Sequence, residues 1–456
     1  MNKTALKKRI LAGGVTIAGI VLTIAGGFIP SAAAKTMDGK VQCRIELDRE
    51  VLPANVTRRA ILKVTLDAPP SPASRKRPAV NLAIVLDRSG SMSGRKLAKA
   101  KEGAITALRR LTPGDIFSLV AYNHLVDTII PAQSVRHPAA IEDQIRQIRA
   151  GGNTALFGGV SQGAAEVRKY VNEAFVHRVI LLSDGLANVG PNTPEDLGRL
   201  GAALIKEGIS VTTVGVGIDY NEDLMTRLSQ NSDGNTYFVE SSADLPRIFS
   251  SELGDVLNVV AQEVQIVIHL ADTVRPLRII GRDGRIRGRS VEFSLNQLYG
   301  SQEKYALVEV EIAGGNDGES REIAYAETIY QNPFTHRQDI SSDRLVAWFT
   351  SDDTRVEQSA NPAVQREYEL NLNAVAQEQA IALSDDGRPK EAARALKESA
   401  RRLKASGKRL KDDRLLKKAE EIEAQADKIE STGMSKRARK VLRTESYQMK
   451  QQQQSQ

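Results

Sequence analysis

The chain has 456 residues, a formal net charge of +7, a hydrophobic content of 41% and a single tryptophan. This length exceeds what one hydrophobic core can organise and predicts about three domains. The ordinary composition excludes an array of membrane spans and predicts a soluble globular class of protein.

The first 34 residues have the pattern of an export segment. Basic residues at positions 3–9 precede an apolar stretch, residues 10–30, which ends in small residues at positions 31–34. This pattern is typical of a cleaved signal peptide. The apolar stretch is long for a signal core, so an uncleaved membrane anchor remains the alternative. On both interpretations the rest of the chain is exported and lies in the periplasm or outside the cell.

Residues 35–77 are predicted to hold the first strands of a sheet and a linker. Alternating apolar and polar residues within 41–66 indicate half-exposed strands, and the proline-rich segment 69–78 indicates a turn-rich connection. The only cysteine, Cys43, falls on one of these strands. A single cysteine cannot form an internal disulfide, so stability must come from packed cores or from metal.

The next strand ends in oxygen-bearing side chains at alternate positions. Residues 80–86 form an apolar run broken only by Asn81, and the run leads into Asp87, Ser89 and Ser91. A buried parallel strand delivers such side chains to the loop at its carboxyl end. One carboxylate and two hydroxyls are hard ligands, suited to Mg²⁺, Mn²⁺ or Ca²⁺.

Strands and helices then alternate as far as residue 260. We expect strands at 117–122, 179–185, 209–217 and 235–240, and helices at 94–111, 139–148, 156–171, 194–206, 221–229 and 245–260. This rhythm predicts a parallel sheet covered on both faces, with its site at the carboxyl ends of the strands. Two loops there carry further oxygen ligands, Thr154 after a glycine-rich turn and Asp184 after a buried strand.

Residues 78–260 resemble a von Willebrand factor type A domain. The metal-ion-dependent adhesion site of that family is built from D-x-S-x-S, a threonine and an aspartate in this order, and all five occur here: Asp87, Ser89, Ser91, Thr154 and Asp184. The segments SDGLANVG at 183–190 and VGVGIDYNEDLM at 214–225 also resemble bacterial members. The resemblance implies an α/β doubly wound parallel sheet with a divalent cation, Mg²⁺ first and Mn²⁺ or Ca²⁺ as alternatives.

The same resemblance implies recognition chemistry. Only two carboxylates lie near the cation, and the family's pattern places some of these ligands outside the first shell through water, so a divalent cation keeps net positive charge and an open position. The expected partner is therefore a protein that presents an Asp or Glu side chain, and we expect no nucleic-acid partner. Thr154 is the residue expected to join the coordination shell when that ligand arrives. No nucleophile, base and orienter occur in suitable contexts, so we do not expect an enzyme.

Two other motifs are interpreted as structural. The G-x-S-x-G match at 159–163 lies inside an expected helix, and no strand leads into Ser161, so packing is the better interpretation. The acidic segment 219–223 begins like an EF-hand loop, but Leu224 stands where glycine is required.

Residues 261–335 change to strands without intervening helices, which predicts an antiparallel β-sandwich. The strands before residue 67 need partners, so we expect the parallel-sheet domain to be inserted into this sandwich. Bacterial members of the family and the inter-alpha-trypsin inhibitor heavy chains suggest this arrangement by similarity.

Residues 336–431 are assigned to an α-helical region, with helices expected at 371–383, 389–403 and 412–429 and a helical hairpin favoured over a tetratricopeptide-like pair. From position 388 onward about 20 basic residues face about 10 acidic ones. Residues 432–456 are basic and then glutamine-rich. They are interpreted as a solvated helix with a fraying end, and contact with an anionic surface is the alternative.

Two functions fit these observations. The first is an exported protein that binds another protein through its metal site, in adhesion or envelope assembly. The second is a membrane-anchored scaffold or accessory chaperone for an envelope complex, associated with the membrane through residues 10–30. The sequence does not indicate the oligomeric state or the partner's identity.

Overall fold

The computed structural model describes residues 39–72, 77–172 and 175–453. The predicted signal peptide or anchor, residues 1–34, lies outside the described residues. Within the described part of the chain, no helix has the length and apolar character needed to cross a membrane.

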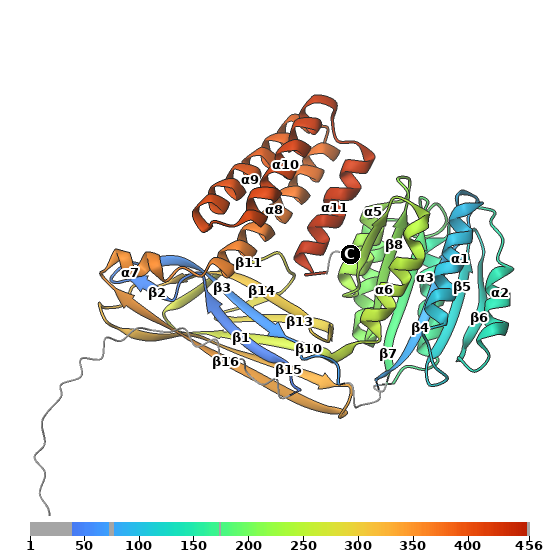
Figure 1. Ribbon diagram of the computed structural model, residues 1–456, viewed down its shortest axis with the longest axis horizontal. Coiled ribbons are helices and arrows are strands. Elements are labelled where there is room, and N and C mark those ends of the chain that lie inside the picture. Colours follow the sequence, from blue (N-terminus) through green and yellow to red (C-terminus); the bar gives the residue numbers. More distant parts are fainter. Residues whose placement is uncertain (1–38, 73–76, 173–174, 454–456) are drawn as a thin grey trace, which may run out of the picture. The chain divides into compact units, whose positions relative to one another are not determined.

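A six-stranded sheet forms the centre of the segment from residue 79 to residue 239 (Figure 1). Its strands follow the order β6-β5-β4-β7-β8-β9 and pair in parallel except for β6, which runs antiparallel to β5. Their bounds are β4 Ala79–Asp87, β5 Ile116–Tyr122, β6 Val126–Ser134, β7 Phe175–Ser183, β8 Ile209–Val216 and β9 Thr236–Val239. β4 lies between β5 and β7, and its residues are buried on both faces by helices, as its apolar run predicts.

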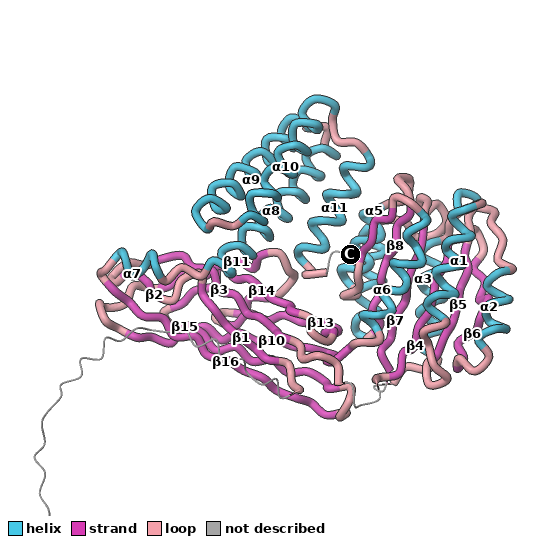
Figure 2. Tube along the Cα trace, viewed as in Figure 1, coloured by secondary structure: helices cyan, strands magenta, loops and turns pink. Residues whose placement is uncertain are grey.

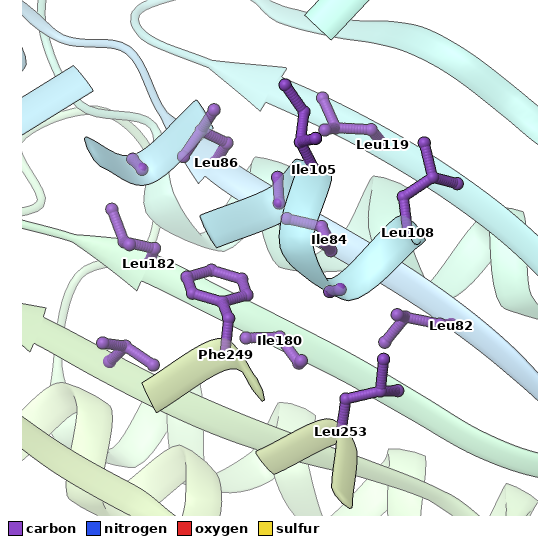
Figure 3. Packing of buried hydrophobic residues seen from close by; sticks show 14 of the residues in the cluster. Leu82, Ile84, Leu86, Ile105, Leu108, Leu119, Ile180, Leu182, Phe249 and Leu253 are labelled. Carbon is purple, nitrogen blue, oxygen red and sulfur yellow. The ribbon is translucent and has the colours of Figure 1, made fainter. Parts of the chain in front are cut away.

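Helices cover both faces of this sheet (Figure 2). Alternate residues of β4 face opposite sides, so Ile84 packs with α1 and α6 while Val85 packs with the helices of the other side. Figure 3 shows the first of these two layers, with Phe249 of α6 beside Ile180 of β7. The helices are α1 Arg95–Leu108, α2 Pro138–Arg146, α3 Leu156–Arg168, α4 Pro194–Leu204, α5 Glu222–Asn231 and α6 Leu245–Val256.

The remaining strands form a β-sandwich into which the parallel-sheet domain is inserted, as predicted. One sheet has the order β1-β3-β14-β11 and the other β12-β13-β10-β15-β16-β2. The chain leaves the sandwich after β3, which pairs with β1 and β14, and returns at β10. The bounds are β1 Gln42–Leu47, β2 Val51–Pro53, β3 Arg58–Asp67, β10 Val259–Leu270, β11 Val274–Ile280, β12 Arg285–Arg287, β13 Ser290–Tyr299, β14 Glu303–Ile312, β15 Ser320–Asn332 and β16 Arg337–Thr350.

A buried arginine fixes the parallel sheet to the sandwich. Arg178 of β7 is fully buried, and its guanidinium donates to Gln297 Oε1 and Tyr299 Oη of β13, each at 2.7 Å. It also lies 3.6 Å from the buried carboxylate of Glu252 in α6. A buried charge is tolerated only with such partners, so this contact specifies how the two domains join.

The carboxyl-terminal region is a helical bundle that follows the short helix α7 Asp353–Gln358. Its helices are α8 Pro362–Asp385, α9 Pro389–Leu410, α10 Asp413–Thr432 and α11 Lys436–Lys450. Leu396, Ile422 and Leu442 share one core with residues of α8. The bundle therefore extends the predicted helical hairpin to four helices.

Four expectations about the elements were wrong. Strand β6 was not predicted, and β16 lies in the segment expected to be helical, so the sandwich reaches Thr350. The last helix of the parallel-sheet domain ends at Val256, and β10 begins at Val259. The tail does not fray within its described part, because α11 is a regular helix and residues as far as 453 make hydrogen bonds.

Candidate metal site

All five predicted site residues lie at the carboxyl edge of the parallel sheet. Asp87 is the last residue of β4, and Asp184 follows the last residue of β7, the strand paired with β4. Ser89 and Ser91 lie on the turn between β4 and α1, and Thr154 precedes α3. The parallel pairing of β4 with β7 therefore brings segments 97 residues apart in sequence to one point.

Asp87 is held by neutral donors. Its carboxylate accepts hydrogen bonds from the Ser89 backbone N–H at 2.8 Å and from Ser183 Oγ at 2.7 Å. The side chain is fully buried, and burial raises the pKa of Asp87 although these hydrogen bonds oppose the effect. A buried carboxylate without a cationic partner favours a bound cation.

The hydroxyl groups connect Asp87 with Asp184. Ser89 Oγ lies 3.0 Å from Ser91 Oγ, which donates to Asp184 Oδ1 at 2.7 Å. A Cβ atom added at Gly185 would lie 3.3 Å from Ser91 Oγ and 3.5 Å from Thr154 Oγ1. The hydroxyls of Ser91 and Thr154 thus approach the same point beside Asp184.

Lys96 of α1 is a site residue that sequence reasoning missed. Its ammonium group contacts Asp184 Oδ2, and 35% of its side chain remains exposed. The two carboxylates therefore differ, because Asp184 has a protein cation beside it and Asp87 has none.

Two asparagines, also missed, hold the loop that carries Thr154. Asn188 Oδ1 accepts from the Thr154 backbone N–H at 2.8 Å, and Asn123 Nδ2 donates to Gly151 O at 2.6 Å. Gly152 has a φ of +82°, and a Cβ there would collide with the His124 ring. The loop is therefore fixed through neighbouring loops, and the glycine is required. Asn188 lies in the segment 183–190, whose resemblance to bacterial members is the sequence feature that could have identified it.

The donor set fits a hard divalent cation. Two carboxylates and three hydroxyls supply only oxygen, which suits Mg²⁺, Mn²⁺ or Ca²⁺ and not zinc or copper. Across residues 39–72, 77–172 and 175–453, no group of three or more His, Cys, Asp or Glu side chains could hold a metal ion. A metal site here therefore depends on hydroxyl ligands, namely Ser89, Ser91 and Thr154.

The motifs interpreted as structural have structural roles. Ser161 lies inside α3, where Gly159 packs on the Tyr122 ring and Gly163 packs on Val85. The acidic segment 219–223 leads into α5, and its carboxylates bind α11.

Helix α11 binds the flank of the parallel-sheet domain through charge pairs. Lys440 Nζ donates to Glu222 Oε2 at 2.5 Å and to the Tyr220 carbonyl at 2.8 Å. Arg439 donates to Glu222 at 2.5 Å and to Asp223 at 2.6 Å. The basic residues of this helix therefore neutralise carboxylates of the same chain, which corrects the expectation of a solvated helix.

The glutamines after α11 close the edge of the parallel sheet. Gln453 accepts from the backbone N–H of Thr236 at 3.0 Å and donates to its carbonyl at 3.2 Å. Thr236 belongs to β9, the edge strand. Unpaired edge groups favour pairing with other chains, so the side-chain amide of Gln453 protects this edge.

Comparisons with known proteins agree with this architecture. Residues 81–251 match the family model of the von Willebrand factor type A domain. An uncharacterized protein of Synechocystis sp. is 26% identical over 294 residues, which are 62% of this chain and 69% of that protein. The uncharacterized protein YfbK of Escherichia coli is 28% identical over 231 residues, 50% of this chain and 40% of that protein. Inter alpha-trypsin inhibitor heavy chain 4 of Mus musculus is 29% identical over 164 residues, 34% of this chain and 17% of that protein.

Solved structures share the fold over most of the chain. A von Willebrand factor type A protein from Catenulispora acidiphila has a TM-score of 0.62 and 18% identity, covering 81% of this chain and 89% of that one. The ArnB paralog VWA2 from Sulfolobus acidocaldarius has a TM-score of 0.60 and 16% identity, covering 90% and 98%. The family match shows that residues 81–251 form a von Willebrand factor type A domain, and the two solved structures share its fold over most of the chain.

Proposed function

We propose that this chain binds a protein partner through a divalent cation, and that the partner contributes an Asp or Glu carboxylate. A von Willebrand factor type A domain indicates protein–protein interaction or adhesion. The observation that carries the finer proposal is the environment of Asp87, a buried carboxylate with neutral donors that lies beside three hydroxyls and a second carboxylate.

The five residues have distinct roles in this proposal. Asp87, Ser89 and Ser91 hold the cation from the β4 turn, and Asp184 orients Ser91 through a hydrogen bond. A bound Mg²⁺ supplies an electrophilic position for a carboxylate oxygen of the partner. Thr154 lies on a loop outside the strands, and its backbone is positioned by side-chain amides, so its hydroxyl can turn toward the cation without breaking a strand.

The proposal is tested by capturing partners from an envelope extract with the purified chain in Mg²⁺ and in EDTA. We expect a specific band in Mg²⁺ that is absent in EDTA and absent with Asp87→Ala. Thr154→Ala should weaken capture by on the order of 1–3 kcal/mol, the usual size of a coupling free energy. Ser161→Ala is the matched control inside α3 and should capture as well as wild type. Equal capture by all variants, in both buffers, would contradict the proposal.

We also propose that the chain is exported, and that residues 1–34 serve either as a cleaved signal or as an anchor. Sequencing the amino terminus of the mature protein distinguishes these possibilities. A start at Lys35 supports a freely exported binding protein, whereas an intact Met1 supports a membrane-anchored scaffold.

A further inference from the structure

Three large apolar side chains are exposed around the carboxyl edge of the parallel sheet. Leu125, Leu186 and Ile218 are exposed by 57%, 60% and 43%. They lie on the loops that follow β5, β7 and β8 respectively. We call these three side chains the apolar rim. Burying them in a complex would remove apolar surface from water, which favours association.

Each residue of the apolar rim is connected to residues of the metal site, either by a hydrogen bond or by its position in the chain. The Leu125 backbone N–H donates to Asn123 Oδ1 at 2.8 Å, and Asn123 also holds the loop of Thr154. Leu186 comes two residues after Asp184. Ile218 follows Gly217, where an added Cβ would lie 3.9 Å from Lys96 Nζ.

The order of the strands places the rim on both sides of the carboxylates. The strands run β5-β4-β7-β8, so the site on β4 and β7 lies between the loop of Leu125 and the loop of Ile218. Neighbouring strands lie about 4.8 Å apart, so β5 and β8 are separated by about 14 Å. The loops of Leu125 and Ile218 therefore flank the candidate cation position, and they follow strands separated by about this distance.

We propose that the partner binds as an extended segment in which the acidic residue is flanked, two positions away on each side, by a large apolar residue. This inference rests on the proposed function, because it needs the acidic residue to reach the cation. In an extended chain residues i−2, i and i+2 face one way, and four steps of about 3.3 Å span about 13 Å. That span matches the distance between the outer strands. Charge complementarity selects the central residue, and the apolar rim selects the two flanking ones.

Two synthetic peptides of identical composition test whether the apolar residues must lie two positions from the acidic residue. Ser-Leu-Ser-Glu-Ser-Leu-Ser places both leucines on the face of the glutamate, whereas Ser-Ser-Leu-Glu-Leu-Ser-Ser places them on the opposite face. Fluorescence polarisation with the full chain in Mg²⁺ should show about tenfold tighter binding of the first peptide, as expected for partial burial of two leucines. A version of the first peptide with Gln for Glu, and either peptide in EDTA, should bind at least tenfold more weakly.

Variants of the rim give the matched control. Leu125→Ser and Ile218→Ser should reduce the tenfold preference to about twofold or less while leaving Mg²⁺ affinity unchanged. Ile340→Ser changes a side chain of similar exposure, 55%, on β16 of the sandwich and should leave the preference intact.

The outcomes separate this inference from the proposed function. Equal Mg²⁺-dependent affinity for both glutamate peptides would overturn the register and leave metal-dependent capture standing. No measurable binding of either peptide would overturn the extended-segment inference, while the envelope capture would still report on the function. Binding that is insensitive to EDTA and to the Gln replacement would contradict both.

Discussion

The type A domain carries two groups of carboxylates whose surroundings differ. On its flank, Glu222 and Asp223 are paired with Arg439 and Lys440 of α11, and the Lys440 and Glu222 side chains are 4% and 7% exposed. At the carboxyl edge of the sheet, Asp87 accepts from the Ser183 hydroxyl and from the Ser89 backbone N–H, which are neutral donors. Glu222, Asp223 and Asp87 are all largely buried, but Asp87 has no cation of the chain beside it.

This difference distinguishes acidic residues with a structural role from those to which we assign the proposed function. A carboxylate that is already paired with buried cations has little to gain from a metal or a partner, whereas a buried carboxylate with neutral donors is stabilised in its charged form when a cation binds. Asp184 is intermediate, since Ser91 and Lys96 both contact it. Changing the cations beside one group of carboxylates at a time tests this difference.

The largest effect is expected on the flank. Lys440→Ala should lower the free energy of unfolding by about 3 kcal/mol, because it leaves the buried Glu222 with only one cationic partner. Urea denaturation measures this loss. Lys436→Ala is the control, since its pair with Asp219 is exposed by 72% and 70% and should contribute less than about 0.5 kcal/mol. Equal losses in the two variants would show that the buried contacts of α11 do not stabilise the domain.

A carboxylate without a matched cation should make stability depend on pH. Burial, with a smaller effect of Glu252, raises the pKa of Asp255 from 3.8 to about 7. The folded chain then binds a proton between about pH 4 and pH 7 that the unfolded chain lacks, so this group's contribution to stability falls as pH rises through that window. Asp255→Asn should therefore be about 1–2 kcal/mol more stable than wild type at pH 8 and equal to it at pH 4. Thermal melts at both pH values measure the difference, and a variant less stable than wild type at pH 8 would contradict the assignment.

The smallest effect is expected at Asp184, the carboxylate of the site that has one cation of the chain beside it. Lys96→Met removes the cation beside Asp184 and should tighten Mg²⁺ binding by about 0.5–1 kcal/mol, because like charges at the site repel. Titration calorimetry checks this. Lys99→Met, three residues along the same helix, alters a surface pair with Glu102 and should leave Mg²⁺ affinity unchanged. Weaker Mg²⁺ binding by the Lys96 variant would indicate that Lys96 holds Asp184 in place.

The sequence predicted those parts whose residues carry a clear period or motif. The apolar runs of β4 and β7 predicted buried parallel strands, and the strands before residue 67 predicted a shared sandwich. Strand β16 was missed because it has apolar residues on both faces, with Trp348 exposed and Phe349 buried. Strand β6 was missed because Pro131 interrupts its apolar pattern, as is tolerated at a sheet edge.

The position of α11 could not be predicted from the sequence, because a basic side chain can pair with any accessible carboxylate of the chain. The Arg and Lys residues of α11 indicate that carboxylates will be needed, but the sequence does not say that Glu222 and Asp223, over 200 positions earlier, will supply them. At the candidate site the five proposed ligands were predicted from an ordered motif, and the structure places them at one edge of the sheet. Lys96 and Asn123 belong to no such motif, and Asn188 lies in the segment 183–190 without a spacing that marks its role.

The central claim is that Asp87 binds a divalent cation, and calorimetric titration of the purified chain with Mg²⁺ tests it most directly. We expect saturable one-site binding by wild type and a loss of that binding in Asp87→Ala. Circular dichroism should be unchanged in the variant, because the strands and helices are specified by apolar residues on either side of the sheet. Equal Mg²⁺ affinity in wild type and a folded Asp87→Ala variant would contradict the account.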